Sequence, residues 1–265
     1  MLIVPDVSTD LLGRIPSGTN ELVHEQLVQA GIRFRQWMLG NLAHAAGHFG
    51  LALIGPPEFG WLDRSIGAPV EGTRWLRVVS EEEQWVGDAC WTGNLAANVF
   101  DALRKPYVLD VCEWDDWRRV RAELMTLMPG EPCSPAEALR LPDEWWIDLR
   151  KTTDAIAAMP TDRFSTDQAE VAGRIQQHYG NSVNPAVRHW ETAHGDLRWA
   201  NLRGPDFGLL DWKQWGRAPV GMDAATLLCD SFAVPELAER VRDVFADVLD
   251  AGRLAQLYVE ARVRR

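Results

Sequence analysis

The sequence predicts an α+β fold in which short strands dominate the first half of the chain and helices the second. Three observations support this class. Residues 51–80 form short runs broken by Gly and Pro, residues 119–124 alternate polar and apolar side chains, and residues after Gly130 carry apolar side chains at helical spacing. With 265 residues, the chain can bury a sizeable core.

The composition favours a cytoplasmic protein. The first ten residues have no basic region and no long apolar stretch, so they do not resemble a signal peptide, and no run approaches the roughly 18 apolar residues of a membrane span. The four cysteines are far apart and form no C-x-x-C pair, which favours free thiols. A net charge of −11 argues against nucleic acid and would attract a cationic small molecule. We therefore expect no nucleic-acid or membrane partner.

The first 50 residues are expected to be helical. Their apolar residues at helical spacing fall in two groups, with Gly31 expected to end the first helix: Val23, Leu27 and Ala30, then Phe34, Met38 and Leu42. Strands are then expected at residues 59–61, 64–70 and 73–79. The acidic triplet 81–83 is expected to open a helix running towards Phe100, because acids in a first turn favour the helix dipole.

Two further strands are expected at residues 107–114 and 119–124, the second of which exits into Pro129-Gly130. Capping boxes then predict helices after Ser134 and Ser165, and a third helix is expected over residues 143–159. The chain after Thr226 is expected to be helical, with Val241, Phe245 and Leu249 on its apolar face.

The stretch from Thr192 to Ala225 organises the functional prediction. It places five polar residues in a fixed order: His194, Asp196, Asn201, Asp211 and Asp223. Gly204-Pro205-Asp206-Phe207-Gly208 is a strong turn signal, and a hairpin centred there would put Asn201 opposite Asp211. An amide oxygen and a carboxylate suit Mg²⁺. An acidic turn with a capping Asp would explain one or two of these residues but not their order.

This order resembles that of protein kinases, which have H-R-D-x-x-x-x-N followed by D-F-G. The Gly after His194 and the Trp after Asp211 resemble the aminoglycoside phosphotransferase family of small-molecule kinases more closely. The resemblance spans roughly residues 55 to 250 and implies a two-lobed protein-kinase-like fold. The expected parts are an N-terminal helical segment (1–50), a small, mainly antiparallel N-lobe (51–128) and a mainly helical C-lobe (129–265).

The resemblance also implies ATP or GTP, Mg²⁺ and a phosphoryl acceptor. Asp196 would be the base that takes the proton of a substrate hydroxyl, with His194 as the second catalytic candidate, more suited to fixing the loop than to proton transfer. Asn201 and Asp211 would hold Mg²⁺, and Asp223 would brace the loop.

The expected nucleotide clamp rests on Arg77, which stands where the family usually has a strand lysine that binds the ATP phosphates. A surface arginine on an edge strand is the alternative, and no G-x-G-x-x-G loop precedes it. Glu82, Glu83 and Asp88 are open candidates for the acid that pairs with Arg77. Backbone groups of Met125, Thr126 and Leu127 would pair with the purine, unless this segment is a simple strand-to-helix link.

Three residues depart from the family pattern. Arg198 and Trp199 stand where His-Pro is common, and Lys213 stands where an acid is common. A non-catalytic, pseudokinase-like nucleotide-binding protein is therefore the alternative function, whereas a protein kinase and a metal hydrolase are disfavoured. Aminoglycosides, macrolides, amino alcohols and sugars remain open as substrates.

Overall fold

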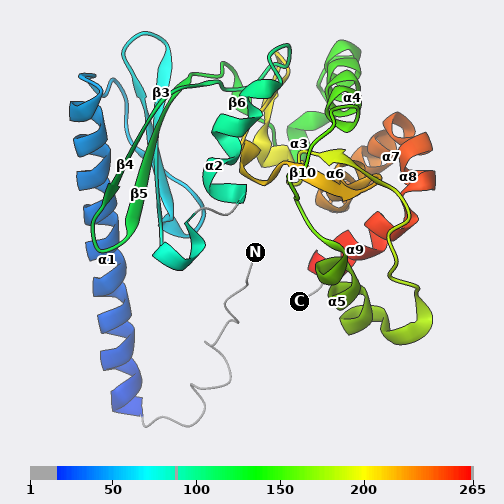
Figure 1. The fold of residues 1–265 in the computed structure, drawn as a ribbon, viewed down its shortest axis with the longest axis horizontal. Helices are drawn as coiled ribbons and strands as arrows, with labels where there is room; N and C mark the ends of the chain where they lie inside the picture. The colour runs from blue at the N-terminus through cyan, green and yellow to red at the C-terminus, as the bar shows by residue number, and fades with distance from the viewer. Residues whose placement is uncertain (1–16, 87–88, 264–265) are drawn as a thin grey trace. The chain divides into compact units, whose positions relative to one another are not determined.

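The computed structural model describes residues 17–86 and 89–263, which are drawn as helices, strands and loops in Figure 1. The chain forms two compact units. The sheet unit comprises Met1–Glu82 and Asp110–Leu124, and the helical unit comprises Glu83–Leu109 and Met125–Arg265.

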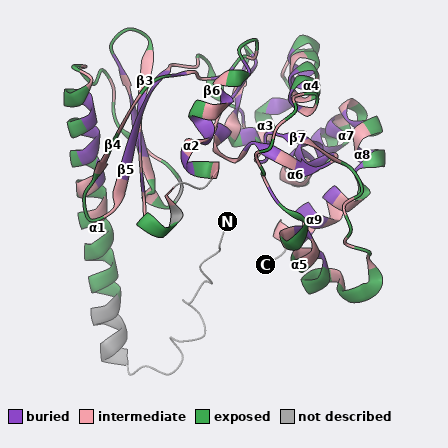
Figure 2. Cartoon of the chain, in the orientation of Figure 1, coloured by how far each residue is buried: buried purple, intermediate pink, exposed green. Residues whose placement is uncertain are grey.

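The sheet unit packs one long helix on one antiparallel sheet. The sheet has the order β1-β2-β3-β5-β4, formed by β1 (Glu58–Phe59), β2 (Ser65–Val70), β3 (Arg74–Glu81), β5 (Arg119–Thr126) and β4 (Val108–Asp115). Helix α1 (Ser17–His48) buries Met38 and Leu42 against the sheet residues Leu76 and Val120. The expected strands of this sheet are confirmed, and Figure 2 shows that the buried residues in the described part of α1 lie beside the sheet.

Three local expectations are wrong in this region. Gly31 does not end a helix, since α1 runs through it without a break. The first strand ends at Phe59 because Leu62 and Asp63 take positive φ values of 54° and 56° and turn the chain. The acidic triplet does not open a helix, because β3 continues through Glu81, whose carboxylate pairs with Arg118 at 3.1 Å. A 3₁₀ turn (Glu83–Trp85), helix α2 (Ala89–Ala96) and a second 3₁₀ turn (Ala97–Val99) follow.

The helical unit is built around buried aromatic residues, among them Trp145, Trp199, Phe207 and Trp212. Its helices are α2 (Ala89–Ala96), α3 (Pro135–Ala138), α4 (Asp143–Ala157), α5 (Gln168–Tyr179), α6 (Met222–Ser231), α7 (Pro235–Val244), α8 (Ala246–Ala251) and α9 (Arg253–Val263). Its short strands are β6 (Glu131–Pro132), β7 (Trp190–Ala193), β8 (Leu202–Gly204), β9 (Gly208–Leu209) and β10 (Gly216–Pro219). The expected α+β class is therefore confirmed.

The two expected capping boxes differ in outcome. Ser134 precedes α3, and its hydroxyl donates to the Glu137 carboxylate at 2.6 Å. Helix α5 instead begins at Gln168, with Asp167 rather than Ser165 as its cap, and Asp167 Oδ1 accepts the Glu170 N–H at 2.8 Å. A carboxylate near the positive end of a helix satisfies an N–H that has no intrahelical partner.

The expected hairpin forms, but its register differs by one residue. Leu202 pairs with Leu209 and Arg203 with Gly208, so the residue opposite Asn201 is Leu210 rather than Asp211. Phe207 lies in the turn, where its ring is buried in T-shaped contact with Trp145 at a centroid distance of 5.4 Å. This pairing centres the turn between Pro205 and Asp206, and the centre of the turn sets the register.

Candidate active site

The loop that carries the motif is anchored at its start by a strand pair and a buried carboxylate. Strand β7 pairs antiparallel with β10, and its last residue, Ala193, lies opposite Gly216. Asp223, in the first turn of α6, accepts the backbone N–H groups of His194 at 2.7 Å and Gly195 at 2.9 Å. The loop therefore leaves the sheet along a path that Asp223 fixes.

Gly195 is required by this path. Its φ of +85° lies in the left-handed region, and a Cβ atom there would lie 2.3 Å from Ser165 Oγ and 2.6 Å from the Gln214 carbonyl oxygen. The glycine between His194 and Asp196 thus allows the loop to pass close to two neighbouring segments of the helical unit.

A continuous hydrogen-bonded path links the loop to the hairpin. Asn201 Nδ2 donates to the Asp196 carbonyl oxygen at 2.8 Å and to Asp196 Oδ2 at 3.3 Å. The Asn201 carbonyl oxygen accepts the Leu210 N–H at 2.8 Å. Asp211 comes next in the chain, with φ 59° and ψ 61°, a left-handed conformation that is uncommon outside glycine and several-fold enriched in aspartate and asparagine. Hydrogen bonds thus link Asp196 through Asn201 to Leu210, and Asp211 is the next residue in the chain.

The side chain of His194 is enclosed by the protein. Its side chain is fully buried, and its Nε2 donates to the Leu210 carbonyl oxygen at 2.9 Å, which places the ring proton on Nε2. Its ring also meets the Trp212 ring edge-to-face at 5.0 Å. These contacts hold the segment before Asp211, and the catalytic role of His194 stays a prediction.

Both expected acids are paired with cations of this chain. Arg198 Nε lies 3.1 Å from Asp196 Oδ1, and Lys213 Nζ lies 2.6 Å from Asp211 Oδ2. Trp199, by contrast, points into the core, where it stacks on Trp145 at 6.0 Å. Of the two residues in the His-Pro position, only Arg198 is thus exposed beside the loop.

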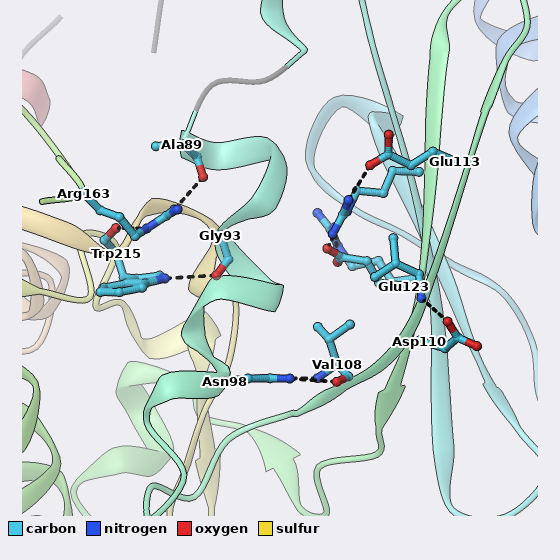
Figure 3. Close-up of polar contacts among 12 residues, drawn as sticks. Ala89, Gly93, Asn98, Val108, Asp110, Glu113, Glu123, Arg163 and Trp215 are labelled. Carbon is cyan, nitrogen blue, oxygen red and sulfur yellow. Dashed lines mark hydrogen bonds and ion pairs between the residues drawn. The ribbon is translucent and has the colours of Figure 1, made fainter. Parts of the chain in front are cut away.

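Helix α2 supports the segment that carries Asp211. Trp215 Nε1 donates to the Gly93 carbonyl oxygen at 3.0 Å, and Arg163 Nη2 donates to the Ala89 carbonyl oxygen at 2.5 Å (Figure 3). A Cβ atom on Gly93 would lie only 2.2 Å from the Lys213 carbonyl oxygen. Helix and segment therefore meet backbone to backbone, a contact that the sequence pattern did not indicate.

A buried lysine beneath the site was also missed. Lys105 is 3% exposed, and its Nζ lies 4.0 Å from the Tyr107 ring centroid and 5.7 Å from that of Trp212. Burial lowers its pKa to about 8.

Burial also shifts the pKa of the carboxylate that braces the loop. It raises the pKa of Asp223, whereas the nearby His194 and the N–H groups of His194 and Gly195 act to lower it.

The expected nucleotide-binding residues lie in different surroundings from those anticipated. Arg77 Nη1 pairs with Glu123 Oε2 of strand β5 at 3.0 Å. Glu82 pairs with Arg118 instead, and Asp88 lies outside the described residues. The Thr126 N–H donates to the Tyr107 carbonyl oxygen at 2.9 Å and is therefore used within the protein.

The donor set around Asn201 is compatible with a magnesium ion that takes only two protein ligands. A carboxylate and an amide oxygen are hard ligands, and Mg²⁺ retains waters or phosphate oxygens for its remaining positions. Within the described residues, no three or more His, Cys, Asp or Glu side chains gather as a metal-binding group. A site with its own complete protein cage is thus not found in that part of the chain.

The fold is that of the aminoglycoside phosphotransferases and of protein-kinase-like proteins. Among solved structures, wild-type aminoglycoside 2'-phosphotransferase-IIIa in complex with GDP matches with a TM-score of 0.62 and 13% identity, over 85% of this chain and 89% of that one. Aminoglycoside phosphotransferase APH(3'')-Id from Streptomyces rimosus matches with a TM-score of 0.56 and 16% identity, over 84% and 96% of the two chains. A choline/ethanolamine kinase family protein from Mesorhizobium loti matches at 0.51 and 15%, over 80% and 77%.

Two comparisons that use the sequence alone find no match. No protein-family model matches it, and no curated protein matches it either. Among the described residues, no helix combines the length and the apolar character needed to cross a membrane.

Proposed function

We propose that the protein is a small-molecule kinase that transfers the γ-phosphoryl group of ATP or GTP to a hydroxyl group. The observation that carries the proposal is the hydrogen-bonded path from Asp196 through Asn201 to the residue before Asp211. This path joins a potential base to an amide, and it ends one residue before a carboxylate; an amide oxygen and a carboxylate suit Mg²⁺. Asp223 and His194 fix the loop without touching the substrate.

In the proposed reaction, the hydroxyl oxygen attacks the γ-phosphorus, and its proton passes to the Asp196 carboxylate. The bond between the γ-phosphorus and the β,γ-bridging oxygen breaks, and the nucleoside diphosphate leaves. Asn201 and Asp211 would hold Mg²⁺, which when bound neutralises charge on the β- and γ-phosphates. Arg77 would bind the phosphates as a donor of charged hydrogen bonds.

The purine would pair with backbone groups of Met125, Thr126 and Leu127. Because the Thr126 N–H is used within the protein, its carbonyl and the groups of its neighbours are the candidate partners. The solved relatives support the choice of ligands to test. The Streptomyces rimosus enzyme was solved with ADP and streptomycin, and an amicoumacin kinase with AMP-PNP and Ca²⁺. A small, hydroxylated and cationic acceptor also suits the net charge of −11.

The test is turnover of Mg·ATP or Mg·GTP by the purified protein with a panel of aminoglycosides, macrolides, amino alcohols and sugars. We expect nucleoside diphosphate release that depends on one acceptor class. Asp196→Asn should lower that turnover by about 10²- to 10⁴-fold while leaving the melting temperature unchanged. Normal turnover in Asp196→Asn would show that Asp196 is not the base.

A second function is favoured by one observation. Arg198 and Lys213 pair with the two acids that the reaction needs, as they would in a nucleotide-binding protein without catalysis. Binding of Mg·ATP with no turnover on any acceptor of the panel would support this alternative.

A further inference from the structure

Arg77 is held by a carboxylate of its own sheet. Arg77 lies on β3 and Glu123 on β5, and these strands are neighbours in the sheet order. The side chain of Glu123 is 1% exposed and that of Arg77 is 19% exposed, so the pair is largely removed from water. A carboxylate buried to this degree keeps its charge only with close partners.

Two arginines of the described part of the chain pair with Glu123. Its Oε2 accepts Arg77 Nη1 at 3.0 Å, and its Oε1 accepts Arg121 Nε at 3.1 Å. Arg121 is fixed in turn by Glu113, on the neighbouring strand β4 (Figure 3). Each oxygen of Glu123 thus orients a different guanidinium, and Arg77 uses one of its five N–H donors for this contact.

The helix that follows β3 supplies no acid within its described residues. Helix α2 reads Ala-Cys-Trp-Thr-Gly-Asn-Leu-Ala, and its Gly93 packs against the backbone of Lys213. Its backbone carbonyl oxygens accept from Trp215 and Arg163. Helix α2 is thus packed against the segment that follows Asp211.

We propose that Glu123 is the positioning residue for Arg77, and that it orients the Arg77 guanidinium for the phosphates of the bound nucleotide. This inference rests on the proposed function, since it requires that Arg77 binds those phosphates. The acid that pairs with Arg77 is then a residue of β5, whereas the sequence pattern suggested Glu82, Glu83 or Asp88. The remaining N–H donors of Arg77 are then held in a fixed plane before the nucleotide binds.

The test compares dissociation constants for Mg·ATP and for adenosine in wild type, Glu123→Gln, Arg77→Gln and the double variant. We expect Glu123→Gln to weaken Mg·ATP binding by about tenfold, the effect of one charged hydrogen bond. Adenosine lacks phosphates, so its affinity should stay within about twofold. The double variant should bind Mg·ATP no more weakly than Arg77→Gln, because Glu123 acts through Arg77.

Glu113→Gln is the matched control, since Glu113 belongs to the same cluster and pairs with Arg121 and Arg119. It should leave Mg·ATP binding within about twofold of wild type. Unchanged Mg·ATP binding in Glu123→Gln, an equal loss in Glu113→Gln, or an equal loss for adenosine would overturn the proposal.

Two further results keep the test decisive. If Glu123→Gln does not fold, Glu123→Asp takes its place, because it keeps the charge but withdraws the carboxylate by one methylene. Wild-type Mg·ATP affinity in Glu123→Asp would then overturn the proposal. Failure of the wild-type protein to bind ATP or GTP would overturn the proposed function itself, whereas wild-type binding with an insensitive Glu123 would overturn only this inference.

Discussion

Asp223 holds Gly195 in a backbone conformation that other residues rarely adopt. The carboxylate accepts the Gly195 N–H at 2.9 Å and the adjacent His194 N–H at 2.7 Å, while Gly195 has a φ of +85°. The loop that contains Asp196 thus depends on an anion from a helix that begins 27 residues later. The conformation of the loop can therefore be tested through Asp223 without changing Asp196.

Replacing Asp223 should destabilise the protein without removing any group that contacts substrate. Asp223→Ala leaves two buried N–H groups without an acceptor, which costs about 2–4 kcal/mol of unfolding free energy. Urea unfolding measures this loss. Asp230→Ala is the control, since Asp230 accepts a single backbone N–H, that of Trp199 at 3.0 Å, and should cost less. Equal losses in the two variants would contradict the bracing role.

Two glycine-to-alanine substitutions should change the stability of the protein in opposite directions. Gly93→Ala brings a Cβ atom to 2.2 Å from the Lys213 carbonyl oxygen, so we expect a loss of at least about 2 kcal/mol in stability. Gly173→Ala, in the exposed part of α5, meets no atom within 4 Å and should stabilise its helix by about 0.5–1 kcal/mol. Thermal melts of both variants provide the comparison. A stabilised Gly93→Ala variant would show that α2 does not pack against the segment after Asp211.

Lys213 should compete with a metal ion for Asp211. Its ammonium lies 2.6 Å from Asp211 Oδ2, and removing this partly exposed cation should raise the affinity for Mg²⁺ or Mn²⁺ about threefold to tenfold. Titration of Mn²⁺ in the presence of ADP measures the change in Lys213→Met. Lys213→Arg keeps the charge and should resemble wild type. A weaker metal affinity in Lys213→Met would mean that Lys213 helps to form the site.

Lys105 should make stability depend on pH in the alkaline range. Its pKa is about 8 in the folded protein and 10.5 at its ordinary value. Between these values the unfolded chain holds more protons than the folded protein, so the free energy of unfolding rises with pH. From pH 8 to 10 we expect wild type to gain about 2 kcal/mol relative to Lys105→Met.

Paired urea titrations at each pH measure this difference between wild type and Lys105→Met. Lys151→Met, at an exposed position of α4, should show no such trend relative to wild type. A pH-independent difference between wild type and Lys105→Met would show that Lys105 titrates normally.

Local patterns predicted much of the fold because they reflect local physics. The alternation over residues 119–124 became β5, with Val120 in the core and Arg121 and Glu123 on the other face. The Gly-Pro-Asp turn became the β8–β9 hairpin. The one-residue error in its register came from the expected centre of the turn, since the pairing of Leu202 with Leu209 centres it between Pro205 and Asp206.

The candidate site was predicted less completely, because its supports are distant in the chain. Glu123 lies 46 positions from Arg77, and only the pairing order of the strands brings them together. The shared face of Arg121 and Glu123 was a readable signal, since residues two apart in a strand point the same way. No pattern marked Lys105 or the approach of Gly93 to Lys213.

The pairing of Arg77 with Glu123 has a consequence for control of activity. In protein kinases, the acid that pairs with the strand lysine lies on a helix whose position is regulated, so activation can depend on moving that helix. Here, the cation and its acid belong to strands β3 and β5 of one sheet. If Arg77 binds phosphates as proposed, the pairing with its acid would not require the movement of a helix.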